Sequence, residues 1–285
     1  MLRLLLAAAF AATVPFVPND PGYGAERAQF EAMRVPQAWS LTQGDPAVVI
    51  AIIDDGVRAD PDLDLTDGYN NASGTHGTTM ALVAAAQINN GIGSAGICGQ
   101  CRVMPVHGDV VAGMAWAIDH GADVIAITGC GPPPPKTAIS AATAHGVPVY
   151  YCQNESEAFP TAAIAGITGL MLTCNPALTP AETHGILRST PQLDAFYAVK
   201  RAGCRAKPAE IVRLIVRTRG QGTVTRRPDD DTYNAGTVVV LRAKAHQGWR
   251  FSRWSGVCRG KRATCSVRLM QSGVTTAVFR RKSGA

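Results

Sequence analysis

The stretch that most constrains this chain is an unbroken apolar run, Val48 to Ile53, followed directly by Asp54, Asp55 and Gly56. A short run of this kind without polar alternation is typical of a parallel strand that is covered on both faces. Open α/β sheets carry their chemistry at the carboxyl ends of such strands, so Asp54 is a candidate functional carboxylate. Asp-Gly is also a common turn pair, and this stretch alone is equally compatible with an ordinary turn.

A second stretch, residues 74–81, reads Gly-Thr-His-Gly-Thr-Thr-Met-Ala and places His76 22 residues after Asp54. A lone histidine is more often structural than functional. Here glycines flank the histidine, and glycine allows the backbone of a substrate to approach closely. His76 is therefore the second candidate functional residue.

Both stretches resemble motifs of the subtilisin-like serine proteases, or subtilases. The family's aspartate motif is D-D-G in its kexin-like branch, and its histidine motif is H-G-T-x-[VM]-A. The order aspartate, histidine, serine is the subtilisin order of the catalytic triad. The resemblance implies that Asp54 orients the imidazole, that His76 is the general base, and that Asn154 serves the oxyanion hole. It also implies a peptide or protein substrate.

The family's nucleophile motif, G-T-S-x-A-x-P, fits this chain in two registers. A local match to S-x-A-x-P places Ser156 at the nucleophile, with Ala158 and Pro160 in place. Aligning the following helix without gaps places Ala158 there instead. The first register needs two extra residues in the helix, a rotation of about 200°, and the helix must keep its apolar face, so we favour the ungapped register. The hydroxyl of Ser156 would also suit a helix N-cap.

The alternation of strand and helix patterns predicts the α/β fold class: a shortened subtilisin-like parallel sheet flanked by helices, followed by a small all-β domain. The strands that end at Asp54, Thr128 and Asn154 should be neighbours in one parallel sheet. We predict a subtilase-like domain over residues 18–203 and a basic, β-rich domain over residues 209–279.

The second domain contains several short alternating strands punctuated by glycines. Residues 248–256 resemble the B-repeats of internalin-type bacterial surface proteins, and Cys258 and Cys265 would close a hairpin. Residues 205–285 carry 18 Lys and Arg against 4 acids, whereas residues 1–204 carry 9 against 17. This basic excess can bind an anionic cell-surface polymer or nucleic acid, but a solvated basic face explains it as well, since no nucleic-acid motif accompanies it.

The start of the chain and the cysteines indicate export. Arg3 precedes an apolar run within residues 1–12, as in a short signal peptide. Eight cysteines fit an oxidising compartment, so we expect a secreted or cell-surface protein with no later membrane span. The Cys98–Cys101 pair favours a local disulfide or structural thiols over a zinc or redox site, and Cys130 and Cys152 end consecutive strands, where they can bridge. We predict no cofactor and no metal ligands.

Three functional hypotheses remain open. The first is a secreted serine endopeptidase that uses Asp54, His76 and Ser156. The second is a catalytically inactive subtilase relative that acts as a surface or binding protein. The third is a shortened chain without a stable function.

Overall fold

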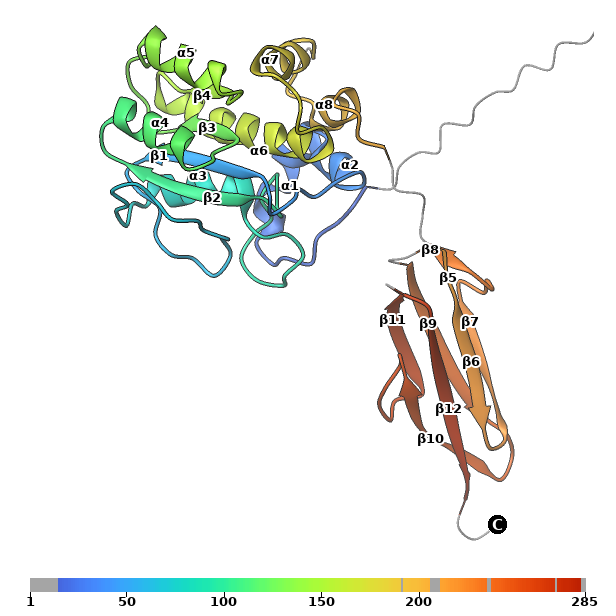
Figure 1. Cartoon of the computed structure of the whole chain (residues 1–285). Helices are drawn as coiled ribbons and strands as arrows, with labels where there is room; N and C mark the ends of the chain where they lie inside the picture. Colours follow the sequence, from blue (N-terminus) through green and yellow to red (C-terminus); the bar gives the residue numbers. More distant parts are fainter. Residues whose placement is uncertain (1–14, 191, 206–210, 235–236, 270, 283–285) are drawn as a thin grey trace, which may run out of the picture. The chain divides into compact units, whose positions relative to one another are not determined.

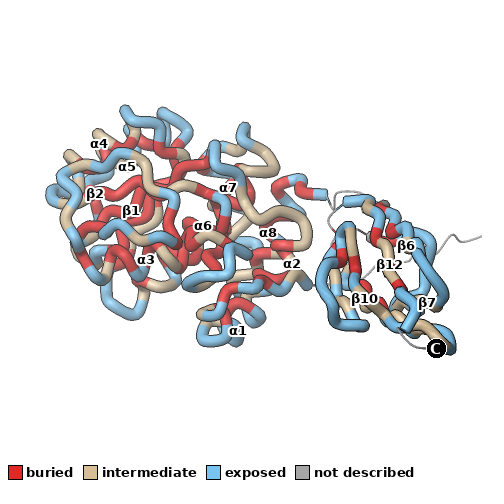
Figure 2. Tube along the Cα trace, turned by 90° about the horizontal axis from the view of Figure 1, so that it is seen from below, coloured by how far each residue is buried: buried red, intermediate tan, exposed pale blue. Residues whose placement is uncertain are grey.

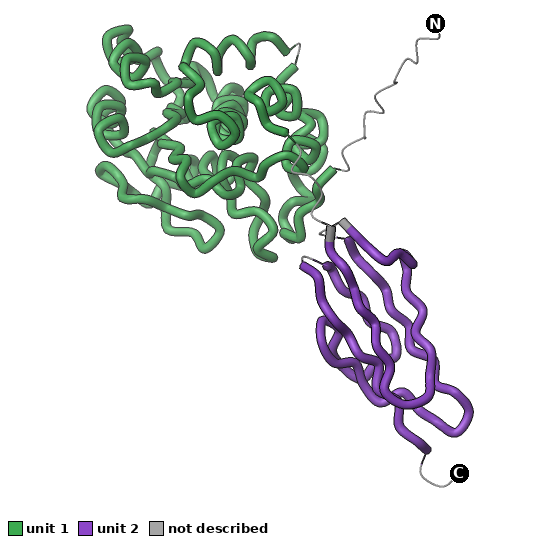
Figure 3. The backbone as a smooth tube through the Cα atoms, turned by 45° about the vertical axis from the view of Figure 1, so that its right-hand side comes forward, with its two compact units in different colours: residues 1–206 green, residues 207–285 purple. Residues whose placement is uncertain are grey.

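The chain forms two compact units, residues 1–206 and residues 207–285, coloured separately in Figure 3. The computed structural model describes residues 15–190, 192–205, 211–234, 237–269 and 271–282. The predicted signal peptide, residues 1–12, lies outside the described residues.

The first unit is built on a parallel sheet with the strand order β2-β1-β3-β4. The strands are β1 (Val49–Asp54), β2 (Arg102–His107), β3 (Val124–Ile127) and β4 (Val149–Tyr151). Ile53 of β1 pairs with Ile127 of β3, which in turn pairs with Tyr151 of β4. The strands that lead to Asp54, Thr128 and Asn154 are therefore neighbours, as predicted, and their carboxyl ends share one edge.

Helices cover both faces of this sheet (Figure 1). They are α1 (Tyr23–Ala32), α2 (Val35–Trp39), α3 (His76–Ala85), α4 (Val110–Asp119), α5 (Lys136–Ala144), α6 (Ala158–Cys174), α7 (Pro180–Arg188) and α8 (Ala195–Arg201), with a 3₁₀ turn η1 (Glu155–Glu157) before α6. Ile50 and Ile52 of β1 face a core shared with α3 and α6. Ala51 and Ile53 face a second core beneath α4 and α5. This two-sided burial explains why β1 is apolar without alternation.

Helix α6 is the central helix of the larger core, and Figure 2 shows buried residues along it and along β1. The segment Glu155–Cys174 is long and apolar enough to cross a bilayer, but 67% of its most apolar window is buried inside the unit. Burial of this kind is typical of a core helix in a globular domain.

Four disulfides join the cysteines: Cys98–Cys101, Cys130–Cys152, Cys174–Cys204 and Cys258–Cys265. The local bridge and the hairpin bridge agree with the sequence predictions. Cys130–Cys152 ties the segments that follow β3 and β4. The sequence offered no signal for Cys174–Cys204, which joins the end of α6 to the residues after α8.

The second unit contains two three-stranded sheets, with the orders β10-β12-β6 and β11-β9-β7, and a small β5-β8 pair. Its strands are β5 (Ile211–Val212), β6 (Leu214–Arg219), β7 (Gly222–Arg227), β8 (Tyr233–Asn234), β9 (Thr237–Ala245), β10 (Trp249–Gly256), β11 (Thr264–Leu269) and β12 (Gly273–Arg281). Leu241, Trp254 and Phe279 are buried between the two sheets. The predicted fold class, a helix-flanked parallel sheet followed by a small β-domain, is confirmed.

Candidate functional site

Asp54 and His76 meet at the carboxyl end of β1. Asp54 is the last residue of β1, and His76 is the first residue of α3. The Nδ1 atom of His76 lies 2.9 Å from Oδ2 and 3.0 Å from Oδ1 of Asp54. The contact expected between the two motifs is present, and its geometry suits a carboxylate that accepts a hydrogen bond from Nδ1–H and so fixes the tautomer of the ring.

The Asp54 carboxylate is only 2% exposed and is fully engaged by donors. The Thr128 hydroxyl donates to Oδ2 at 2.6 Å, and the backbone N–H of Asp55 donates to Oδ1 at 2.7 Å. Thr128 follows β3, so two neighbouring strands hold this carboxylate at the shared edge. The sequence placed Thr128 at this edge but gave it no role toward Asp54.

Asp55 is a residue whose role the sequence did not reveal. Its carboxylate accepts hydrogen bonds from the backbone N–H groups of Gly77, at 2.7 Å, and His76, at 3.3 Å. Burial alone would raise the pKa of Asp55, but these hydrogen bonds outweigh it and lower the pKa. Asp55 thus satisfies N–H groups that the first turn of α3 leaves free, and an acidic residue is favourable there.

Glycines make the close approach of the two motifs possible. A Cβ atom on Gly77 would lie 2.4 Å from the carbonyl oxygen of Gly56 and 2.8 Å from Cβ of Asp54. Gly56 itself has a φ of +105°, which L side chains rarely adopt. Gly77, one of the two glycines that suggested close substrate approach in the sequence, therefore serves the packing of the site itself.

His76 is partly exposed, with 37% of its side chain accessible. The hydrogen bond that His76 donates to Asp54 raises the pKa of His76 against the opposing effect of burial, and the charges of Asp54, Glu155 and Asp55 add to the increase. The imidazolium form is thus favoured relative to a free histidine.

The structure places Ser156 and Asn154 beside each other rather than against His76. Ser156 lies in η1, and its Oγ donates to Oδ1 of Asn154 at 2.5 Å. Asn154 Nδ2 donates to Glu157 Oε1 at 2.9 Å. Within the described residues no hydrogen bond joins Ser156 to His76. Ser156 does not cap a helix either, because α6 starts at Ala158 without a side-chain cap, so the N-cap interpretation is wrong.

Glu155 is the acidic group closest to the free side of the imidazole. Its Oε2 atom lies 3.9 Å from His76 Nε2, within ion-pair range, although its side chain is 86% exposed. The sequence did not single out this residue, because no spacing rule links it to His76. The ring nitrogen that would serve a serine in a triad faces a carboxylate here.

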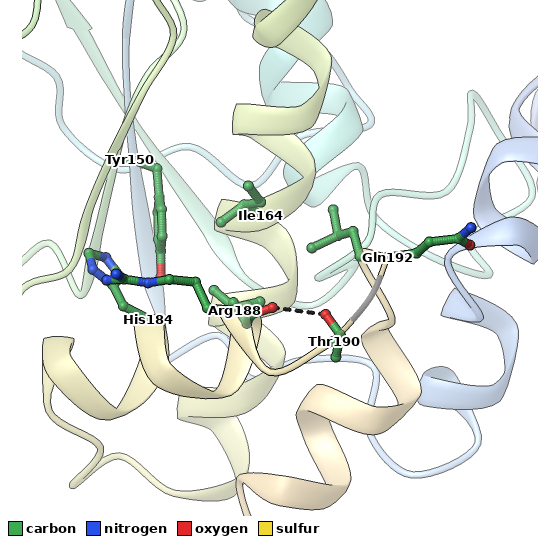
Figure 4. Close-up of a pocket in the computed structure, with 8 residues that line it drawn as sticks. Tyr150, Ile164, His184, Arg188, Thr190 and Gln192 are labelled. Atoms are coloured by element: carbon green, nitrogen blue, oxygen red, sulfur yellow. Dashed lines mark hydrogen bonds between the residues drawn. The ribbon is translucent and has the colours of Figure 1, made fainter.

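Two of the cavities in the first unit lie beside β4. One, of about 320 Å³, lies at the ends of β3 and β4 and is lined by Val110, Ile127, Gly129–Pro135, Tyr151 and Cys152. The other, of about 380 Å³, lies between β4, α6 and α7, with Tyr150, Ile164, His184 and Arg188 among its lining residues (Figure 4). Burial lowers the pKa of His184 and raises that of Tyr150. Among the described residues no three His, Cys, Asp or Glu side chains are grouped to hold a metal ion.

The first unit is a helix-flanked parallel sheet with an Asp–His pair at its carboxyl edge, and comparisons with known proteins show which proteins share this arrangement. Thermitase of Thermoactinomyces vulgaris is 33% identical over 135 residues, 40% of this chain and 48% of thermitase. The halolysin-like extracellular serine protease Nep of Natrialba magadii is 31% identical over 138 residues, 38% of this chain and 25% of that protein. The chain spans less than half the length of these relatives.

Solved structures agree on the fold. A protease of Pseudoalteromonas arctica matches with a TM-score of 0.57 at 20% identity, over 65% of this chain and 99% of that chain. Fervidolysin of Fervidobacterium pennivorans, described as a keratinolytic enzyme related to subtilisin, matches with a TM-score of 0.54 at 16% identity, over 87% of this chain and 54% of that chain.

Residues 212–283 match the family described as the divergent InlB B-repeat domain. The chain is therefore a subtilase relative in its N-terminal part and carries an InlB B-repeat-like domain at its C-terminal part.

Proposed function

We propose that the first unit is a peptide-binding subtilase relative that retains the Asp54–His76 pair but does not present a serine to it. The observation that carries this proposal is the hydrogen bond of Ser156 Oγ to Asn154 Oδ1 at 2.5 Å, with Glu155 rather than a hydroxyl next to His76 Nε2. An acyl-enzyme requires Nε2 to accept the proton of the nucleophile. In subtilisin itself, loss of the serine costs on the order of a millionfold in turnover.

The second candidate is a serine endopeptidase in which Asp54, His76 and Ser156 form the triad and Asn154 serves the oxyanion hole. The intact contact between Asp54 and His76 supports it, as do relatives named as proteases. This function requires the exposed turn at residues 154–157 to rearrange so that Ser156 Oγ meets His76 Nε2. Catalytic hydrogen bonds often shorten only when substrate is bound.

A serine-reactive phosphonate probe separates the two candidates. We expect the full chain to remain unlabelled and a tetrapeptide anilide to shift the His76 ring resonances without being hydrolysed. Labelling that Ser156→Ala abolishes, and that the matched surface variant Ser189→Ala leaves intact, would establish the endopeptidase instead. Failure of the anilide to perturb His76 would contradict peptide binding.

A further variant tests the register of the nucleophile. Ala158 is the first residue of α6 and is only 3% exposed. If the ungapped alignment is correct, Ala158→Ser restores a hydroxyl at the family's nucleophile position. Probe labelling of Ala158→Ser that His76→Ala abolishes would support this register, and absence of labelling would count against it.

We also propose that the protein is secreted or held at a cell surface, and that its second unit binds an anionic surface polymer. The support is the charge division, with 18 Lys and Arg against 4 acids in residues 205–285, together with a relative named as an extracellular protease. Retention of the full chain on a polyglycerol phosphate column, compared with a neutral dextran column, tests the polymer.

A further inference from the structure

Five arginines lie on the outer face of the β10-β12-β6 sheet. Ala277 and Phe279 of β12 are buried, so the residues between and beside them point outward. The registers place Arg217 and Arg219 of β6, Arg250 and Arg253 of β10, and Arg280 of β12 on that outward side. We call these five residues the arginine face, and all five are exposed.

The arginines of this face are crowded together. Arg250 and Arg280 are directly paired across β10 and β12. Arg253 and Arg219 both pair with Val278, from opposite sides, so they flank one β12 residue. Directly opposed side chains have Cβ atoms about 5 Å apart, and like charges in that position destabilise a sheet.

Among the described residues, no acidic group compensates this crowding. Strands β6, β10 and β12 contain no Asp or Glu. Within the described part of the chain, none of the five arginines makes an ion pair or a side-chain hydrogen bond. The acids of the described second unit are the three consecutive residues Asp229, Asp230 and Asp231, and two of them pair with Arg226 of β7. The arginine face therefore holds an unneutralised charge that an external anion would relieve.

The outer face of the β11-β9-β7 sheet provides a natural comparison. Its registers place Arg227, Arg242, Lys244 and, on β11, Arg268 outward, since Val239 and Leu241 of the same sheet are buried. On β7 and β9, Arg227 pairs with Val240, Arg242 with Thr225, and Lys244 with Thr223. On β11, Arg268 pairs with Val238, so no two of these four cations are directly opposed. The two faces thus carry comparable charge in different arrangements.

The chemistry of the arginine face favours phosphate groups on a polymer without bases. The guanidinium group offers a planar fork that matches phosphate oxygens in a bidentate manner. The aromatic residues of these strands do not lie on this face: Trp254 and Phe279 are buried, and Phe251 packs against both. Trp249 lies on the same side of β10 as Phe251 and packs against the same core. Single-stranded nucleic acids rely on stacking of bases on aromatic side chains, which this face does not offer.

We propose that the arginine face is the site at which the second unit binds a linear, phosphodiester-linked glycopolymer of a cell surface. This inference rests on the polymer-binding function proposed above and assigns it to one sheet. Successive outward residues of a strand are about 6.6 Å apart, so Arg217 and Arg219 form a row along which consecutive phosphates can bind. Val274 and Val278 lie on the same face and offer apolar contact to the carbon atoms between phosphates.

The test uses the full chain and immobilised polyglycerol phosphate. The triple variant Arg219→Ala, Arg253→Ala, Arg280→Ala should weaken binding about tenfold, since each exposed ion pair contributes a fraction of the affinity. The matched control Arg227→Ala, Arg242→Ala, Lys244→Ala removes the same charge from the other sheet and should weaken binding less than about threefold. Replacing Arg219, Arg253 and Arg280 by lysine should weaken binding to an intermediate degree, because lysine keeps the charge but lacks the planar guanidinium fork.

Three other outcomes would contradict the proposal. Equal losses in the two triple variants would show that diffuse charge binds the polymer, which overturns the arginine face but leaves the proposed polymer binding intact. No binding by the unmodified chain would overturn both. Tighter binding to poly(dT) than to polyglycerol phosphate would assign the face to nucleic acid and overturn the polymer class. Circular dichroism of each variant verifies that the sheets are retained.

Discussion

Asp54 and His76 are held by partners that are distant in the sequence, whereas Asn154 and Ser156 bond within their own turn. The Asp54 carboxylate accepts hydrogen bonds from the hydroxyl of Thr128, 74 residues away, and from the ring of His76, 22 residues away. Ser156 bonds to Asn154, two residues away, and Asn154 bonds to Glu157, three residues away. We call these the dyad half and the nucleophile half of the site.

This difference shows how much each half depends on the rest of the fold. The dyad half is fixed by the packing of β1, β3 and α3, so its geometry follows from the core. The nucleophile half is an exposed 3₁₀ turn and the residue before it, held by hydrogen bonds among the side chains of Asn154, Ser156 and Glu157. Substitutions in the dyad half should therefore lower the free energy of unfolding, and substitutions in the nucleophile half should leave it nearly unchanged. The following predictions test that contrast, from the largest expected effect to the smallest.

The largest effect is expected for Gly77→Ala. The new Cβ would meet the Gly56 carbonyl oxygen at 2.4 Å, and a backbone atom cannot move aside cheaply. We expect the free energy of unfolding of the first unit to fall by about 3 kcal/mol, as for overpacked cores. Gly185→Ala in α7 is the control, because open space surrounds Gly185, and it should gain about 0.5–1 kcal/mol. Urea unfolding measures both, and equal stabilities would contradict the close packing of the two motifs.

A smaller loss in the free energy of unfolding is expected for Thr128→Val. The substitution keeps the shape of the side chain but removes the 2.6 Å hydrogen bond to the buried Asp54 carboxylate. We expect a loss of about 2 kcal/mol in the free energy of unfolding, the usual range for a hydrogen bond to a charged group. Thr128→Ser keeps the hydroxyl and should therefore retain most of the free energy of unfolding. In Thr79→Val the lost hydroxyl bonds only to Thr75 within one helix turn, and the change should stay within about 0.5 kcal/mol.

The pH dependence of stability should respond to Asp54→Asn. A raised pKa of His76 in the fold stabilises it below the unfolded value of about 6.5, and this contribution disappears as pH rises through the folded pKa. The contribution should stay below about 1 kcal/mol, because the imidazole is 37% exposed and screened by solvent. NMR titration should show a lower pKa of His76 in Asp54→Asn and a smaller decrease in Glu155→Gln. Identical titrations in wild type and Asp54→Asn would disprove the coupling.

His184 should affect the pH dependence of stability in the direction opposite to His76. Burial lowers the pKa of His184, so protonation below about pH 6.5 favours the unfolded chain and opposes the effect of His76. His184→Gln should remove this opposing component and make the stabilisation at low pH more visible. A pH profile unchanged by His184→Gln would show that His184 is not buried as neutral imidazole.

The smallest effect is expected for Ser156→Ala. The hydroxyl bonds only to the exposed Asn154 side chain, so the free energy of unfolding should change by less than about 0.5 kcal/mol. The His76 titration should also remain unchanged. A loss comparable to that of Thr128→Val would show that the nucleophile half is held by the fold after all, and would end the contrast between the two halves.

The sequence alone determined the elements that depend on local pattern. The apolar run before Asp54 predicted a strand buried on both faces, and the two motifs predicted that Asp54 and His76 would meet. The alternation in residues 209–279 predicted a small β-domain, and the spacing of Cys258 and Cys265 predicted a hairpin bridge. Each of these follows from a rule about neighbours in sequence or about strand ends in one sheet.

Only the tertiary structure decided the partners that no spacing rule connects. The hydroxyl of Thr128 reaches Asp54 because β1 and β3 are adjacent, and Glu155 faces His76 because η1 follows β4 at the same edge. The motif match suggested Ser156 as a nucleophile, but the direction of its hydroxyl depends on competing acceptors in the turn. The arginine face likewise appears only once the registers of β6, β10 and β12 are known, since side-chain alternation assigns each arginine to a face only through its buried neighbours.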